Sequence, residues 1–190
     1  LGNVFQQLYS MADAVIVGKF VGTKGLAAVG ATGTITFLII GFLMGVTTGV
    51  TVLTSQKFGA GRMDEMRKTV GNAAILSAVI AVVMTAVSML GMHRLLVFMH
   101  TPEDIFDGAY GYIMIICAGI FTQVLYNLVS SILRALGNSK TPLYFLILAA
   151  GLNIVLDLVF IIFFHWGAPG AAWATVISQG VSGVLCLIYM

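Results

Sequence analysis

Charged residues are scarce in this sequence. Asp, Glu, Lys and Arg together make up 8% of its 190 residues, whereas about a quarter of an ordinary soluble domain is charged. Hydrophobic residues account for 59% of the chain and gather in long runs, and the mean hydropathy is +1.05. This composition excludes a soluble globular domain and indicates a membrane protein.

Signatures of nucleic-acid binding, disulfide frameworks and common enzymes are also missing. The net charge of +2 is too small, and the basic residues too scattered, for a nucleic-acid partner. Cys117 and Cys186 lie inside apolar runs without the spacing of a disulfide framework or a zinc site. Neither a P-loop, nor a serine elbow, nor an HExxH sequence occurs. We therefore expect no enzymatic activity, no cofactor and no structural metal.

Six uncharged runs are each long enough to cross a bilayer, which takes about 20 residues of helix. They cover approximately residues 1–18, 26–55, 69–92, 108–133, 142–164 and 167–190. The three prolines fall in connectors or in the first turn of a run, as helices require. These runs predict an all-α membrane protein with six transmembrane helices. Because both ends lie within apolar sequence, we expect the chain to be part of something longer.

The connectors differ in charge, and this difference predicts their sidedness. Cytoplasmic loops carry the excess of Lys and Arg. The connectors after the second and fourth runs hold six basic residues: Lys57, Arg62, Arg67, Lys68, Arg134 and Lys140. The other connectors hold three: Lys19, Lys24 and Arg94. We therefore expect a bacterial inner-membrane protein whose even-numbered connectors and chain start lie on the cytoplasmic side.

Polar residues inside the spans recur every three or four positions, so each set occupies one helix face. Polar side chains in a membrane are costly and by default mark a pathway or a site. The stripes are Asn3, Gln6, Ser10 and Asp13 with Tyr9 beside them; Gln123, Asn127, Ser130 and Arg134; Asn153 and Asp157; and Thr175, Ser178, Gln179 and Ser182. The spans that carry them should line an interior, and the span 69–92 should be peripheral.

Three glycines at intervals of four, Gly41, Gly45 and Gly49, mark the second span. This repeated small-xxx-small pattern allows two helices to approach closely. We interpret it as a packing seam.

The acidic residues within spans are Asp13 and Asp157. Both spans run outward in the predicted topology, and the two carboxyls lie roughly 8 and 12 Å below the outer helix ends. They are therefore close enough in depth to share one cavity. A carboxyl group in a low-dielectric site can bind a proton near neutral pH, and Asp13, Asn153 and Asp157 also offer oxygens to Na⁺. The structural alternative is that Asn153, one turn away, satisfies Asp157.

Several segments together resemble the N-terminal half of multidrug and toxic compound extrusion (MATE) transporters. The matching segments are LYSMADAVIVGKFVGTKGLAAVG (8–30), TSQKFGAG (54–61), LRALGNSKTP (133–142), NIVLDLVF (153–160) and GAPGAAWATVIS (167–178). The resemblance implies one six-helix lobe of a twelve-helix protein, with the substrate cavity between and within the lobes. It also implies that Asp13 and Asp157 are the acidic residues of the N-lobe, accompanied by Gln6, Asn127, Asn153 and Thr175.

The combined interpretation is an antiporter lobe that exports amphipathic, cationic organic compounds in exchange for H⁺ or Na⁺. Asp13 and Asp157 would couple the ion, and the cavity would be lined by Gln6, Tyr9, Gln123, Asn127, Asn153 and Thr175. The expected partners are organic cations, membrane lipid, and a C-terminal lobe in the same chain or a second copy. Two alternatives stay open: a lipid-linked saccharide flippase of the same superfamily, and a non-transporting membrane assembly subunit.

Overall fold

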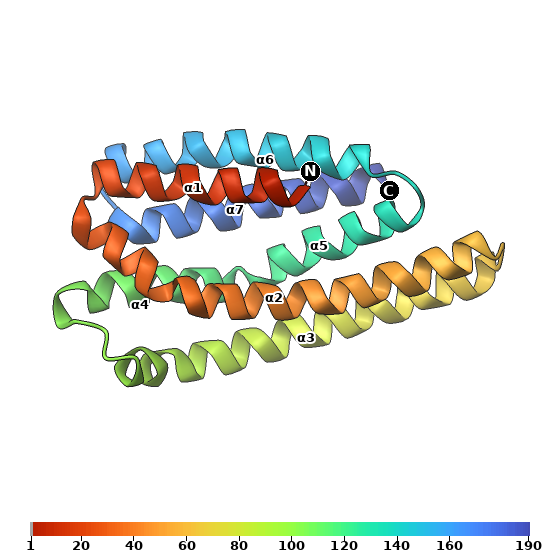
Figure 1. Ribbon diagram of the computed structural model, residues 1–190, viewed down its shortest axis with the longest axis horizontal. Coiled ribbons are helices and arrows are strands. Elements are labelled where there is room, and N and C mark those ends of the chain that lie inside the picture. Colours follow the sequence, from red (N-terminus) through yellow and green to blue (C-terminus); the bar gives the residue numbers. More distant parts are fainter. Residues whose placement is uncertain (1) are drawn as a thin grey trace.

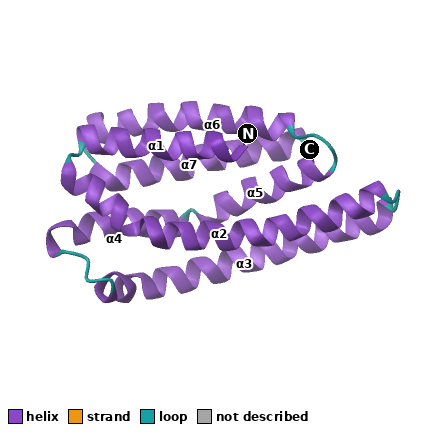
Figure 2. Cartoon of the chain, in the orientation of Figure 1, coloured by secondary structure: helices purple, strands orange, loops and turns teal. Residues whose placement is uncertain are grey.

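The computed structural model describes residues 2–190, with side chains from Met11 onward, and in the described part of the chain short loops join helices and no strand occurs (Figure 2). The elements are α1 (Gly2–Phe20), α2 (Thr23–Gly59), α3 (Met63–Phe98), α4 (Glu103–Ala118), α5 (Ile120–Ala135), α6 (Lys140–Leu158), the π-helical turn η1 (Val159–Phe163) and α7 (Gly167–Tyr189). This agrees with the predicted all-α fold.

The helices form one elongated bundle with α7 near its middle (Figure 1). Helix α7 packs against α4, α5 and α6, while α1 lies along α6 and the α2–α3 hairpin covers α4 and α5. The α2–α3 and α5–α6 connections lie at one end of the bundle, and the α1–α2, α3–α4 and η1–α7 connections lie at the opposite end (Figure 1). The two predicted cytoplasmic connectors therefore share one end.

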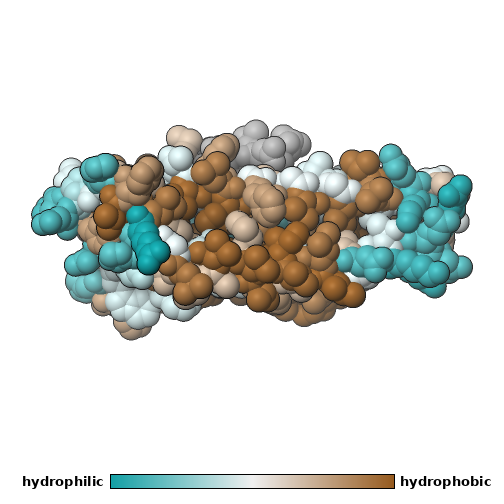
Figure 3. Space-filling model, turned by 90° about the horizontal axis from the view of Figure 1, so that it is seen from below, coloured by the Kyte–Doolittle hydropathy of each residue, from teal (hydrophilic) through white to brown (hydrophobic). Residues whose placement is uncertain are grey.

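The outer surface of the bundle suits a bilayer. Four helices, α2, α3, α7 and α6 extended by η1, are long and apolar enough to cross a membrane, and α4 and α5 qualify as a pair. Large apolar side chains are exposed along them, such as Phe37, Leu90 and Ile75. Figure 3 shows a broad hydrophobic belt between two hydrophilic ends. The chain is a multi-pass membrane protein.

The predicted span 108–133 is not one straight helix, because it breaks at Gly119. Helices α4 and α5 meet there at 45°. A Cβ atom at Gly119 would overlap the side chain of Val176 in α7. The bend thus accompanies a close approach between two helices that only glycine permits, and this approach involves residues far apart in the sequence.

The α2–α3 hairpin is longer than the predicted spans 26–55 and 69–92. Its helices contain 37 and 36 residues, or about 55 Å at 1.5 Å per residue, against about 30 Å of hydrocarbon. Gly61 reverses the chain between them with a φ of +71°, a conformation that glycine adopts without strain.

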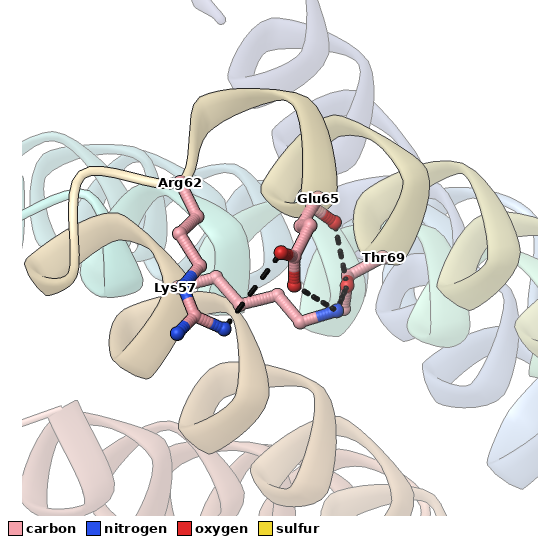
Figure 4. A network of polar contacts seen from close by, with 4 residues as sticks. All are labelled: Lys57, Arg62, Glu65 and Thr69. Carbon is pink, nitrogen blue, oxygen red and sulfur yellow. Dashed lines mark hydrogen bonds and ion pairs between the residues drawn. The ribbon is translucent and has the colours of Figure 1, made fainter.

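A polar cluster joins the two helices just beyond this turn (Figure 4). Lys57 Nζ donates a hydrogen bond of 2.7 Å to Thr69 Oγ1 and lies 3.9 Å from Glu65 Oε2. Arg62 Nη1 lies 3.7 Å from Glu65 Oε1, and Thr69 Oγ1 donates to the Glu65 carbonyl. Three of the four residues thus contact Glu65, which ties the ends of both helices together.

The expected glycine seam of α2 is not formed within this bundle. A Cβ added at Gly41, Gly45 or Gly49 would meet nothing within 4 Å in the part of the chain that the structure describes. The buried face of α2 is instead formed by larger residues such as Ile39, Leu43 and Thr47. The small-xxx-small pattern therefore lies on the outward face of the helix, and periodicity alone does not reveal which face packs.

Candidate functional site

The two predicted carboxylates meet inside the bundle. Asp13 lies in α1 and Asp157 in the last turn of α6, and these two helices pack along each other. Asp157 is fully buried and Asp13 is 6% exposed. The carboxyl groups are close enough to interact with each other. We refer to Asp13 and Asp157 as the carboxylate pair.

Hydrogen-bonding capacity around the pair is left unused by the described side chains. Neither oxygen of Asp157 has a hydrogen-bond partner, nor does Oδ1 of Asp13. The amide of Asn153, one turn before Asp157, is buried and unpartnered at both Oδ1 and Nδ2. The structural alternative required a hydrogen bond from Asn153 to Asp157. The structure shows no such bond. Buried oxygens without partners are costly, and a proton or a small cation would satisfy them.

Tyr112 of α4 also lies near the carboxylate pair, although its sequence context did not identify it. Its side chain is 7% exposed and lies within electrostatic range of both carboxyls. The surrounding residues, from Gly111 to Ile116, are otherwise apolar, so Tyr112 has no polar neighbour one turn away. Helix α4 ends at the break at Gly119, so helical spacing does not relate Tyr112 to the polar stripe of α5, and only the packing of the helices brings it near the pair.

The depth of the remaining predicted residues follows from contacts between helices. Ser182 Oγ in α7 donates to the Phe145 carbonyl in α6, which aligns the two helices. Counting at 1.5 Å per residue, Thr175 then lies roughly 10 Å above Ser182, and Asn153 roughly 12 Å above Phe145. Thr175 and Asn153 therefore share one level, just below the carboxylate pair. Thr175 Oγ1 is buried and unpartnered as well.

Gln123 and Asn127 lie further from the pair. A Cβ at Gly180 of α7 would touch Thr122, so Gln123 is about five residues of α7, roughly 7 Å, below Thr175. Both residues are buried, and Asn127 Nδ2 donates to the Gln123 carbonyl at 2.9 Å. The structure thus places them nearer the end of the bundle that carries the α5–α6 connection. The predicted residues Gln6 and Tyr9 lie outside the described side chains.

The carboxylate pair is closed off in this structure. A hollow of about 300 Å³ opens at the end of the bundle opposite the α2–α3 connection, between the starts of α2, α4 and α7. Lys24 and Asp104 line it and form a salt bridge of 3.6 Å, and Trp166 forms another part of its wall. Neither Asp13 nor Asp157 lines this hollow.

The comparisons with known proteins agree with this architecture. A family model described as MatE matches residues 1–159. The chain belongs to the MATE family. It is 33% identical over its full length to a Bacillus subtilis (strain 168) protein described as "Probable multidrug resistance protein YpnP", of which it covers 43%.

Two solved structures of MATE family transporters superpose closely on this lobe. The chain is 29% identical to both a structure described as the outward-facing conformation and one described as the inward-facing conformation of a multidrug resistance MATE family transporter. The TM-scores are 0.93 and 0.91, over 99% and 97% of this chain and 42% of each solved chain. The chain thus spans less than half the length of its relatives and corresponds to the N-terminal lobe of this family.

Proposed function

We propose that the complete protein is a secondary active antiporter that exports amphipathic, cationic organic compounds in exchange for H⁺ or Na⁺. The carboxylate pair would bind the ion, with Asn153, Thr175 and Tyr112 around it. The second lobe would lie in the same polypeptide, and the bacterial inner membrane would hold the protein.

The observation that carries this proposal is the sign of the buried charge. Among the described side chains, the buried charged groups are Asp13 and Asp157, and neither has a basic partner within salt-bridge distance. An acidic site without a basic partner attracts cations, which favours cationic substrates. The anionic headgroup of a lipid-linked saccharide would require the opposite charge, so this feature disfavours the flippase alternative. It also argues against a purely structural subunit, because packing alone does not require unpartnered carboxyls.

Coupling would follow from competition between two cations for one acidic site. An ion entering from outside binds the carboxylate pair in the outward-open state and neutralises it. The neutral pair binds a cationic substrate less tightly, so the substrate leaves on that side. The differential affinity of the ion for the two conformations then drives the return to the inward-open state. Each cycle moves one substrate outward at the expense of inward ion movement.

The decisive experiment is transport by the complete protein in liposomes. Ethidium, a fluorescent organic cation, serves as the probe, and a proton gradient or a sodium gradient is imposed separately. The proposal predicts ethidium accumulation that depends on one of these gradients and disappears when that gradient is collapsed. Ethidium movement that is independent of both gradients would contradict an antiport mechanism.

A further inference from the structure

Buried polar residues continue from the carboxylate pair toward the cytoplasmic end, beyond what the proposed exchange site requires. We define the polar track as Thr175, Gln179 and Ser182 of α7 together with Gln123 and Ser130 of α5. All five side chains are at most 9% exposed. The α7 residues recur at intervals of four and three, so they occupy one face of that helix.

The contacts between helices order these residues by depth. In α5 and α7, which run in the same direction, Gly119 approaches Val176, Thr122 approaches Gly180, and Tyr126 approaches Gly183. Ser130, one turn below Tyr126, accordingly lies beside Cys186. At 1.5 Å per residue, the eleven residues from Thr175 to Cys186 span roughly 16 Å. The track therefore covers about half of the 30 Å hydrocarbon layer.

Several atoms along the track have no partner. Thr175 Oγ1, Gln179 Oε1 and Ser130 Oγ are buried and make no hydrogen bond to any described group. An unsatisfied buried polar group costs about 1–3 kcal/mol. Three such groups at successive depths would therefore destabilise the bundle if they served packing alone. Internal water commonly satisfies such groups, each molecule making about three hydrogen bonds.

The side chains of the polar track carry hydroxyl and amide groups, and polar residues lie at both of its ends. Its outer end meets Asn153 and the carboxylate pair, with Tyr112 nearby. Its inner end approaches Arg134, which is exposed and bonded to Ser131, while the Tyr126 hydroxyl donates to the Pro142 carbonyl. None of the five track residues carries a carboxylate. Sodium would thus find no counter-charge on these side chains, whereas hydrogen-bonded water between hydroxyls and amides can pass protons.

We propose that the polar track is the proton route between the carboxylate pair and the cytoplasm, which makes H⁺ the coupling ion. This inference rests on the antiport function proposed above. A carboxyl O–H bond of the pair breaks, its proton joins the adjacent water, and each water in turn passes a proton onward. The carboxylate is restored and the last proton enters cytoplasmic water. The track residues orient these waters and are positioning residues.

Ser130 offers a matched pair of test variants in the complete protein. Ser130→Val removes the hydroxyl, whereas Ser130→Thr keeps it. Valine and threonine have the same shape, so the two variants share any steric misfit. We expect Ser130→Val to slow proton-gradient-driven ethidium uptake about tenfold relative to Ser130→Thr, equivalent to about 1.4 kcal/mol in the barrier. Ethidium–ethidium exchange without a gradient should be equal in both, because it requires no proton release.

Gln179→Met provides a second variant at another depth, and Thr32→Val provides the control. The Thr32 hydroxyl is buried in α2 and already bonded to the Val29 carbonyl at 2.9 Å. Gln179→Met should slow gradient-driven uptake while Thr32→Val leaves it at the wild-type rate. Slowed uptake with normal exchange would support the track. Gradient-driven uptake that is equal in Ser130→Val and Ser130→Thr, and normal in Gln179→Met, would overturn it.

Failure of the antiport proposal gives a different result. In that case the wild-type protein itself would show no gradient-dependent ethidium uptake, and both inferences would fall. If the wild type responds to sodium and not to protons, antiport stands and the proton track is wrong.

Discussion

Asp157 is held inside the bundle without a hydrogen-bond partner among the described side chains. An isolated buried carboxylate is strongly destabilising, so the group must be neutralised, whether by a proton or by a bound cation. A residue kept in such surroundings does not contribute to stability through its charge. The proposed ion exchange would account for its presence, whereas packing would not.

Replacing this carboxyl by an amide tests that view directly. In the complete protein, Asp157→Asn should lower gradient-driven ethidium transport about tenfold or more, roughly 1.4 kcal/mol in the transport barrier, because it preserves shape and removes the exchangeable charge. The expression level should stay near that of the wild type. Asp107→Asn, at an exposed position in α4, serves as the control. Loss of expression in proportion to loss of transport would indicate a structural role instead.

The two carboxyls should also titrate as one unit. When two acidic groups interact, their apparent midpoints belong to the pair and not to either residue. We expect the carbonyl infrared band of Asp157 to titrate at a different pH in Asp13→Asn than in the wild type. Likewise, the band of Asp13 should titrate at a different pH in Asp157→Asn than in the wild type. Midpoints that are unaffected by the other substitution would mean that the residues form two separate sites.

Spacing within the sequence found Asp13, Asn153, Asp157 and Thr175 because polar groups in apolar spans stand out. It did not find Tyr112, which has an aromatic ring, lies among apolar residues, and reaches the site only through the packing of α4 against α7 and α2. Nor did it separate the level of Asn153 from that of Gln123, since relative depth depends on how neighbouring helices align.

Gly119 and Gly45 show how differently a glycine can act within a helical element. Gly119 lies where α4 and α5 meet against Val176, whereas Gly45 has open space beside it. Gly119→Ala should destabilise the protein by about 1–3 kcal/mol through overpacking. Gly45→Ala should stabilise it by about 0.5–1 kcal/mol, because alanine has less conformational freedom to lose.

The two variants can be compared by thermal unfolding of the complete protein in detergent, with tryptophan fluorescence as the signal. A lower unfolding temperature for Gly119→Ala and an unchanged or higher one for Gly45→Ala are expected. Equal destabilisation by both substitutions would show that α2 packs through Gly45 against another part of the complete protein.

The positions of the elements were largely predictable, whereas their shapes were not. Each of the six predicted spans overlaps a helix or a broken pair, because about 20 apolar residues in lipid leave the backbone little alternative to helix. The break at Gly119 depends on Val176, 57 residues later, and local periodicity carries no information about such a contact.

The sidedness of the whole lobe can be checked by labelling. Met63, at the start of α3, is 43% exposed, and its connector is predicted to be cytoplasmic. A cysteine at Met63 should react with a membrane-impermeant maleimide only in inverted vesicles, and a cysteine at Glu103 only in intact cells. The native Cys117 and Cys186 are both buried, so their background should be low. Labelling of Met63→Cys from outside would reverse the topology.

At the scale of the molecule, this lobe should move as a unit during transport. Its fold matches an outward-facing and an inward-facing MATE transporter almost equally well, with TM-scores of 0.93 and 0.91. Spin labels at Lys68 and Asp107, on opposite ends of the lobe, should keep one distance distribution when pH or ethidium is changed. A label in each lobe should show a shift. Bimodal distances within this lobe would point to internal rearrangement.

The bend between α4 and α5 also has a consequence for biosynthesis. Each helix has 16 residues, or about 24 Å, which is shorter than the roughly 30 Å hydrocarbon layer. Neither helix can therefore be released into lipid alone as the ribosome extends the chain. We expect the insertion machinery to retain α4 until α5 has emerged as far as Ala135 and then to admit both halves together. This span should leave the translocon later than its neighbours, so its integration is the step most sensitive to synthesis pausing.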